Sequence, residues 1–384
     1  MSQPIRVLHV SHQWHEGGSA LYAAALADEM ARQGAHVRRF GPDDVKQPRQ
    51  RGFAASFGDP AVDSAFAFAA AGMDVVHFHH LSGLSMHLPR VAQTANAKVV
   101  FTLHDYWLGC ARGQLVNDVG ERCCGWSVDR CSRCVATHLW APLPARVAKL
   151  LPRRTNPVRA RHASFERIKR NVDQWFSPST HVATRMGVTA SVLQHPLLGP
   201  IAPAPHPGSG PVRFLFLGSL VPTKGADVLL QAFASLPARS ATLRIVGPAP
   251  PWNGRTNWAE ALVRRIGQVP GASSHPFVPP AEVERELHGC DVLCVPSTWE
   301  ENAPTVITEA AAAGLRIVAS DVGGVREISP SATLVEPGAV EAWRNALAAE
   351  VRRGRGRVSP VLRESLAEHS ATLLLRYADL LHRG

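Results

Sequence analysis

Two glutamates stand in a segment that could bind a hydroxylated, anionic ligand. Glu301 and Glu309 are separated by seven residues; we expect the first to follow a strand over 291–295 and the second to lie in a helix over 305–313. Loops at the carboxyl ends of parallel strands bind ligands, and helix N-termini attract anions. A carboxylate can accept hydrogen bonds from a pair of sugar hydroxyls. On spacing alone, the alternative is a pair of ordinary surface carboxylates.

A second segment has the residues to hold a phosphate. Gly218 follows an expected strand over 212–217, and glycine lets the backbone approach a ligand closely. Lys224 lies seven residues after that strand, where its compact charge could reach a diphosphate. An isolated lysine is more often a solvated surface group, so Lys224 alone does not establish a phosphate site.

The N-terminal half offers weaker signals. His104 follows an apolar run over 98–103, and Gly17-Gly18 follow another over 5–10. A lone histidine is more often structural than catalytic, and a plain turn uses two glycines equally well. Several further histidines lie near strand ends and are read as structural first: His9, His12, His77, His79 and His80.

A cysteine cluster predicts a structural zinc site. Five of the seven cysteines fall within a short stretch: Cys110, Cys123, Cys124, Cys131 and Cys134. The Cys131-x-x-Cys134 pair supplies two thiolates for a tetrahedral ion, and Cys110 with either Cys123 or Cys124 would complete the set. Reduced, unligated thiols are the main alternative and a disulfide the lesser one, whereas Cys290 and Cys294 lie in an apolar strand and are expected in the core.

The glutamate segment resembles the retaining GT-B glycosyltransferases of the large family four, also called glycosyltransferase group 1. The family's pattern runs proline-serine, glutamate, seven residues, glutamate-alanine, then small residues with a glycine. Here Pro296-Ser297 precede Glu301 and Glu309-Ala310 follow, continuing through Gly314 to Asp321, Gly323-Gly324 and Glu327. The resemblance extends over nearly the whole chain, including Phe176-Ser177-Pro178-Ser179 and a final helix over 370–382.

This resemblance implies roles for the residues. Glu301 would contact donor-sugar hydroxyls and Glu309 the nucleotide ribose. The sugar and phosphate groups would be lined by Asn302, Ala303, Pro304 and Thr305. Gly218, Ser219 and Lys224 match the family's phosphate loop, except that Ser219 stands where arginine is common. His104 would face the donor sugar, and Gly17 and Gly18 would form the acceptor-side loop; His104, Lys224 and Glu301 are the expected catalytic residues.

The elements that position these residues alternate between strand and helix in both halves, which favours parallel, doubly wound sheets. With the resemblance, this predicts an α/β protein of GT-B fold: two facing Rossmann-like domains with the active site in an interdomain cleft. The expected divisions are an acceptor-side domain over 1–196 with a Cys-rich and basic excursion at 106–173, a Pro-rich linker at 197–211, a nucleotide-sugar-binding domain over 212–365, and a C-terminal helix at 366–384 returning to the first domain.

Composition limits the alternatives. The 384 residues suit two domains, and 45% apolar residues can fill two cores. No apolar run is long enough to span a bilayer, and the opening residues lack a signal-peptide pattern, so we expect a cytoplasmic protein. The net charge of +10 implies anionic partners. We find no nucleic-acid-binding motif and expect no nucleic-acid partner.

One basic stretch suggests a peripheral membrane contact on the inner face of the membrane. Its cations are Arg146, Lys149, Arg153, Arg154, Arg159, Arg161, Arg167, Lys169 and Arg170. The apolar residues among them are Val147, Leu150, Leu151, Val158, Phe165 and Ile168. Such a segment can lie on an anionic surface, consistent with a lipid-linked or glycan acceptor; the alternative is a solvated basic face.

The sequence therefore predicts a metal-independent glycosyltransferase with no catalytic cofactor, acting with retention in cell-surface polysaccharide or glycolipid synthesis. Two alternatives stay open: a GT-B nucleotide-sugar epimerase, and a non-catalytic membrane-associated protein with a degenerate donor site, which the Ser219 departure would suit. The sequence does not identify the nucleotide, sugar, acceptor, linkage or oligomeric state.

Overall fold

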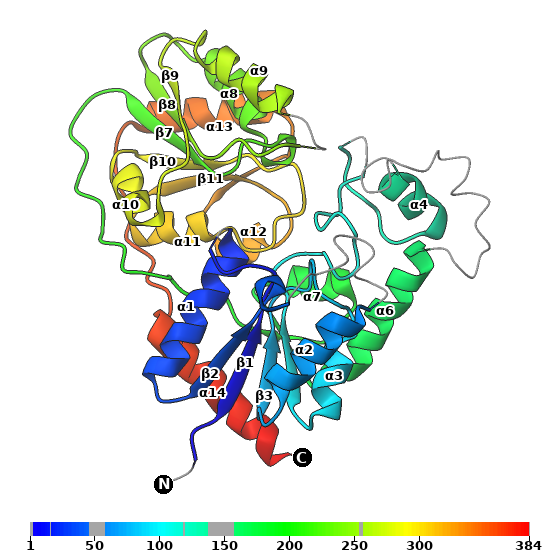
Figure 1. The fold of residues 1–384 in the computed structure, drawn as a ribbon. Helices are drawn as coiled ribbons and strands as arrows, with labels where there is room; N and C mark the ends of the chain where they lie inside the picture. Colours follow the sequence, from blue (N-terminus) through cyan, green and yellow to red (C-terminus); the bar gives the residue numbers. More distant parts are fainter. Residues whose placement is uncertain are drawn as a thin grey trace. The chain divides into compact units, whose positions relative to one another are not determined.

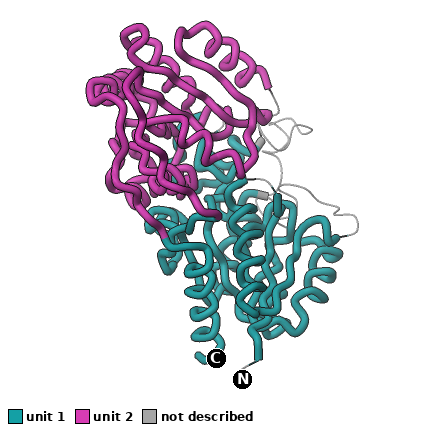
Figure 2. Tube along the Cα trace, turned by 90° about the vertical axis from the view of Figure 1, so that its left-hand side faces the viewer, with its two compact units in different colours: residues 1–198, 364–384 teal, residues 199–363 magenta. Residues whose placement is uncertain are grey.

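The chain forms two compact units, which Figure 2 distinguishes by colour. Unit 1 comprises residues 1–198 and 364–384, and unit 2 comprises residues 199–363. The structure is a computed structural model. It describes residues 3–15, 17–45, 58–117, 120–136, 157–252 and 256–383.

Unit 1 is built on a parallel six-stranded sheet with the strand order β2-β1-β3-β4-β5-β6. Figure 1 labels β1, β2 and β3 of this sheet. Its strands are β1 (Arg6–Val10), β2 (His36–Phe40), β3 (Val75–Phe78), β4 (Lys98–Thr102), β5 (Gln174–Ser177) and β6 (Ser191–Val192). The strand β3 is buried throughout because helices cover both faces of the sheet, and this accounts for its unbroken run of bulky residues.

Helices α1 (Gly18–Arg32) and α14 (Leu366–His382) pack on one face of this sheet. Tyr22, Leu26 and Met30 recur at helical spacing along α1 and are buried with Tyr377 of α14. Ser365 caps α14 in a capping box with Glu368. The remaining helical segments of unit 1 are η1 (Pro42–Asp44), α2 (Pro60–Ala70), α3 (Leu88–Thr94), α4 (Val128–Ala136), α6 (Pro157–Asn171) and α7 (Thr180–Met186).

Unit 2 has a second parallel six-stranded sheet, with the order β12-β11-β10-β7-β8-β9. The strands are β7 (Val212–Leu217), β8 (Ala241–Val246), β9 (Ala272–His275), β10 (Val292–Val295), β11 (Arg316–Ser320) and β12 (Thr333–Val335). The chain winds outward in one direction from β7 to β9 and in the other from β10 to β12. The order therefore reverses between β7 and β10, and ligands bind beyond the carboxyl ends of strands at such a reversal.

Two apolar cores sandwich this sheet. Phe214 and Phe216 of β7 face one core, and Leu215 between them faces the other, as the alternation of side chains along a strand requires. The helical segments of unit 2 are η4 (Pro222–Lys224), α8 (Ala226–Ala234), α9 (Asn257–Ile266), α10 (Pro280–His288), α11 (Thr305–Ala312), α12 (Val325–Ile328) and α13 (Val340–Arg353). The α/β class with doubly wound parallel sheets is as expected.

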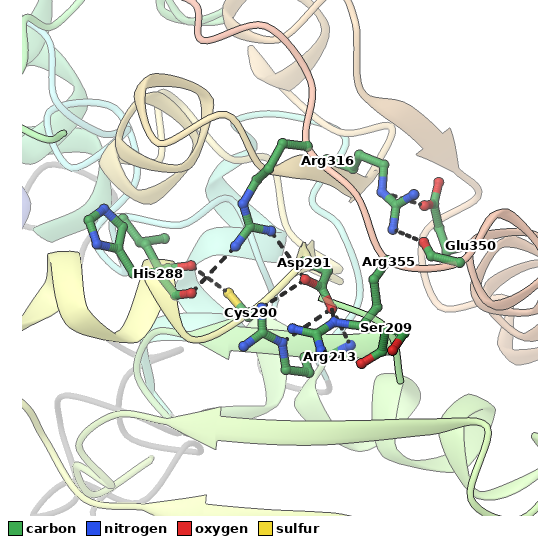
Figure 3. Close-up of polar contacts among 11 residues, drawn as sticks. Ser209, Arg213, His288, Cys290, Asp291, Arg316, Glu350 and Arg355 are labelled. Carbon is green, nitrogen blue, oxygen red and sulfur yellow. Dashed lines mark hydrogen bonds and ion pairs between the residues drawn. The ribbon is translucent and has the colours of Figure 1, made fainter. Parts of the chain in front are cut away.

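A buried carboxylate ties the end of unit 2 to its sheet (Figure 3). Asp291, immediately before β10, is fully buried and accepts hydrogen bonds from Arg213 of β7 at 2.9 Å and 3.2 Å. Arg355 and Arg357, which follow α13, each add a contact of 3.2 Å. Asp291 thus links β7, β10 and the segment after α13.

The segment expected as the linker runs along unit 2 from Gly199 onward. Ala204 donates its backbone N–H to the carbonyl of Ala313 at 2.9 Å, and Ala202 donates to the carboxylate of Glu284 at 2.7 Å. Its prolines leave it without helix or strand, but these contacts anchor it to α10 and α11.

Candidate active site

The loops after β7 and β10 meet at the reversal of strand order in unit 2. The backbone N–H of Thr298 donates to the carbonyl of Thr223 at 2.9 Å. Gly225 has φ 69°, and a Cβ there would lie 1.9 Å from the carbonyl oxygen of Pro296. Only glycine fits so close an approach. Gly225, which follows Lys224, therefore allows the loop after β7 to pack directly against the loop after β10.

Glu301 is buried, and its carboxylate is held by donors from both loops. Its Oε1 accepts from Lys224 Nζ at 2.6 Å, Ser297 Oγ at 2.6 Å and Trp299 Nε1 at 2.8 Å. Among the described residues, no donor contacts Oε2 of Glu301. One oxygen therefore fixes the position of the carboxylate, while the other remains able to accept a hydrogen bond from a ligand.

The backbone of Glu301 is fixed by the double glycine after β11. Gly324 donates its N–H to the carbonyl of Glu301 at 2.8 Å. Gly323 has φ 55°, and a Cβ there would lie 1.8 Å from the same carbonyl oxygen. This close approach gives a physical reason for the double glycine of the motif.

Glu309 lies on α11, in the second turn after its N-terminus. Pro304 precedes α11, and no side chain caps the first turn, so its amides can bind another acceptor. Burial raises the pKa of Glu309 to about 7. No described side chain forms a hydrogen bond or ion pair with its carboxylate. A carboxylate with no partner in the described part of the chain therefore lies near a helix terminus that favours anions.

The structure places every expected donor-site residue of unit 2 at the carboxyl ends of β7 and β10 or on α11: Gly218, Ser219, Lys224, Glu301, Asn302, Ala303, Pro304, Thr305 and Glu309. Lys224 and Glu301 are in direct contact. Ser219 carries no charge, and no contact of the described residues brings a second cation onto the Glu301 carboxylate. Sequence reasoning missed the donors Ser297 and Trp299, although both lie inside the motif.

In unit 1, His104 lies just beyond β4, and Gly17 and Gly18 lie where α1 begins after β1. His104 Nε2 is 3.2 Å from His79 Nδ1, and His79 Nε2 is 2.9 Å from His9 Nδ1. Burial, with His195 and His79 nearby, holds the pKa of His104 well below its usual range. The imidazole is therefore neutral near pH 7.

These three imidazoles share their protons. His104, His79 and His9 each carry one N–H proton when they are neutral. The two hydrogen bonds between the rings use two of these three protons. The third proton therefore lies at one end of the row, on His104 Nδ1 or on His9 Nε2. Neither end atom has a partner among the described residues. Both end atoms are buried, so the third proton can move between the two ends of the chain without charging it.

The nearby group His9, His77 and His79 has ring nitrogens within 4.8 Å of one another, a spacing that would suit a metal ion. His77 is bonded to Thr102 Oγ1 at 2.7 Å and to Tyr377 OH at 2.6 Å. Every ring nitrogen of the group except His9 Nε2 thus has a protein partner. The contacts favour a hydrogen-bond network that joins β1, β3, β4 and α14.

The comparisons with known proteins bear on unit 2 first. Residues 211–352 match the family described as Glycosyl transferases group 1. Unit 2 contains a glycosyl transferases group 1 domain. The motif around Glu301 and Glu309 and the loop of Lys224 all lie within it.

Curated relatives resemble only part of this chain. A D-inositol 3-phosphate glycosyltransferase of Mycobacterium ulcerans is 31% identical over 164 residues, which are 41% of this chain and 34% of the relative. A protein of the same name from Segniliparus rotundus is 31% identical over 181 residues, 44% of this chain and 40% of the relative. The chain therefore matches well under half of each relative's length.

Solved structures resemble the chain throughout its length. Anabaena Alr3699/HepE in complex with UDP and glucose has a TM-score of 0.61 at 15% identity, covering 99% of this chain and 98% of that chain. Sucrose-phosphate synthase from Thermosynechococcus elongatus has a TM-score of 0.61 at 18% identity, with coverages of 99% and 97%. These matches show that the group 1 domain belongs to a chain of GT-B fold class.

The basic stretch differs from the expected membrane-binding segment. Residues 137–156, with Arg146, Lys149, Arg153, Arg154, Val147, Leu150 and Leu151, lie outside the described residues. In α6, Val158, Phe165 and Ile168 are buried, so this helix uses its apolar face for packing. Arg161 is also buried, with its guanidinium 4.1 Å from the centre of the Trp107 ring. These four side chains are therefore occupied in packing, whereas Arg159, Arg167 and Arg170 are exposed, and binding to an anionic membrane stays a prediction.

Within the described ranges, no helix combines the length and apolar character needed to cross a bilayer.

Proposed function

We propose that the protein is a glycosyltransferase that moves a sugar from a nucleotide-diphosphate sugar to an acceptor, with retention and without a catalytic metal. The observation that carries the proposal is Glu301, whose Oε1 is fixed by Lys224, Ser297 and Trp299 while Oε2 has no donor among the residues that the structure describes. This arrangement lies inside a glycosyl transferases group 1 domain.

The donor would bind along the carboxyl ends of β7 and β10. Oε2 of Glu301 accepts a hydrogen bond from a sugar hydroxyl, and Glu309 accepts from the ribose. The amides at the start of α11 receive phosphate oxygens. Lys224, whose side chain is 27% exposed, can turn its ammonium group from Glu301 toward the diphosphate.

Catalysis then follows from charge development. As the bond to the diphosphate breaks, negative charge grows on the leaving group, and the Lys224 ammonium and the N-terminus of α11 lower the energy of that transition state. In the front-side attack that retention implies, the departing phosphate accepts the proton of the acceptor hydroxyl. Protein cations supply the charge stabilisation for which other enzymes use a metal.

The N-terminal unit would supply the acceptor side. His104, held neutral beside His79 at the carboxyl end of β4, and Gly17 and Gly18 at the start of α1 are the residues of unit 1 that we assign to this side. Synthesis of a cell-surface polysaccharide or glycolipid is the proposed context.

A panel of uridine, guanosine and adenosine diphosphate sugars tests the proposal. Uridine donors come first because the similar Anabaena structures contain UDP and UDP-glucose. We expect one donor class to raise the melting temperature of the protein, and Glu301→Gln to reduce that shift. No thermal shift with any donor would refute donor binding.

Turnover separates this proposal from the two alternatives. A glycosyltransferase releases the nucleoside diphosphate as it transfers or slowly hydrolyses the sugar. An epimerase would convert the donor without releasing nucleotide, and a non-catalytic protein would bind the donor and leave it intact. Chromatography of the donor after long incubation distinguishes all three results.

Glu309 should give donor binding a pH dependence. Its pKa is raised to about 7 by burial, so the accepting carboxylate form dominates only above that pH. We expect donor affinity to rise as the pH increases through 7. Glu309→Gln should remove most of this dependence and weaken binding at pH 8 by about ten- to a hundredfold, since a hydrogen bond to a charged group contributes roughly 1.5–3 kcal/mol.

Isothermal titration calorimetry at several pH values measures this effect. Glu282→Gln is the control, because Glu282 is an exposed helical carboxylate of the same unit that pairs with Arg285. A Glu309→Gln variant that kept the wild-type pH profile would exclude Glu309 as the titrating group.

A further inference from the structure

A hollow in unit 1 collects the thiols of the Cys-rich excursion. It has a volume of about 390 Å³ and lies between the loop after β4, a short antiparallel bridge and helices α4 and α6. Its lining includes the thiol-bearing residues Cys110, Cys123, Cys124, Cys131 and Cys134. Segments that are separate in the sequence therefore bring their cysteines to one place.

Little apolar packing holds this region together. Among the described residues of the excursion, Val135 and Val158 form one small buried cluster, with Ala111 and Cys131 packed partly against them, and Tyr106, Leu108 and Val116 are buried outside that cluster. Such a cluster buries far less apolar surface than the cores of the two sheets. Where a small cluster holds chain segments together, a structural metal commonly adds a cross-link.

Four of the five cysteines differ from the fifth in their exposure to solvent. Cys110, Cys123, Cys131 and Cys134 are partly buried, whereas Cys124 is exposed. Arg130 places a guanidinium nitrogen 2.6 Å from the sulfur of Cys124, and so binds that thiol outside the set. The two neighbouring cysteines of the sequence are therefore distinguishable in the structure.

The backbone places the four partly buried cysteines on three supports. Cys131 and Cys134 lie three residues apart on α4, and so share one face of the helix. Cys123 follows the Val116–Arg122 bridge and donates its N–H to the carbonyl of Leu115 at 2.6 Å. Cys110 donates its N–H to the carbonyl of Tyr106 at 2.7 Å, in the loop that also carries His104.

We propose that Cys110, Cys123, Cys131 and Cys134 bind one structural zinc ion. Four thiolates favour tetrahedral zinc, with Zn–S distances of about 2.3 Å. In the described part of unit 1, no three of these sulfur atoms come within 4.8 Å of one another. The sulfur atoms must therefore come closer together when zinc binds, and the ion would then cross-link the three supports.

Elemental analysis of protein purified with reductant and without chelator tests the site. We expect about one zinc per chain, the stoichiometry of one four-coordinate site. Cys131→Ser should lose the metal, and Cys124→Ser, the matched control next to Cys123, should retain it. Zinc lost from both variants, or kept by Cys131→Ser, would overturn the assignment.

A measurement on the wild-type protein covers the case in which a variant fails to fold. Titration with an organomercurial should release the zinc, detected by a chromogenic chelator, as four thiols react. Protein without metal, protein containing iron and sulfide, or thiols already paired as disulfides under these conditions would each overturn the proposal.

Discussion

Lys224→Ala should lower turnover by about 10²- to 10³-fold, the usual cost of removing one preorganised group that stabilises transition-state charge. Donor affinity should change much less, because Lys224 acts most strongly as the diphosphate leaves. Ser297 and Trp299 still donate to Glu301 in the variant, so the carboxylate keeps its position. Steady-state turnover and donor dissociation constants, measured with the donor found in the panel, check this result.

Two variants separate charge from packing at this site. Lys224→Arg retains the cation and should recover part of the lost turnover. Arg285→Ala removes a cation that is 72% exposed on α10 and should leave turnover unchanged. Wild-type turnover in Lys224→Ala would exclude its proposed role, and equal losses of affinity and turnover would indicate that Lys224 serves binding alone.

Much of the fold could be predicted from local patterns. The run over 212–217 reads as a buried strand because both faces of β7 are covered, and the structure has the strand at those residues. In contrast, β9 (Ala272–His275) is an edge strand with the sequence Ala-Ser-Ser-His and has no apolar run to reveal it. Edge strands bury little surface, so composition alone does not mark them.

The candidate site was predictable where contiguous residues form it. Short sequence motifs identify Glu301, Glu309 and Lys224. In each motif a strand, a loop and a helix follow one another directly, so the motif also gives the position of the residue in the fold. The chain His9–His79–His104 was not predictable, since its members come from different strands and pair only through the sheet register. The apolar side of α6 was ambiguous in the sequence for a related reason: an amphipathic pattern does not state whether its apolar face meets a core or a membrane.

Asp291→Asn should destabilise the protein by about 3 kcal/mol, the lower end of the range for breaking a buried ion pair. The carboxylate is fully buried, while Arg213 is 29% exposed and can recover some hydration. The asparagine retains one acceptor oxygen but leaves the positive charges of Arg213, Arg355 and Arg357 without their counter-charge. Urea unfolding followed by tryptophan fluorescence measures the loss as a lower midpoint with an unchanged slope.

The pH dependence identifies the cause of this loss. Burial alone would raise the pKa of Asp291, but the hydrogen bonds and charge of Arg213 outweigh it and hold the pKa below its usual range. A depressed pKa stabilises the fold above the unfolded value of about 3.9, and this stability disappears as the pH falls through the lower folded value. The difference in unfolding free energy between wild type and Asp291→Asn should therefore be constant above pH 5 and shrink below pH 4.

Asp321→Asn is the matched control: its ion pair with Arg326 is exposed, so its removal should cost less than about 1 kcal/mol. Equal losses in the two variants would show that burial gives Asp291 no special role.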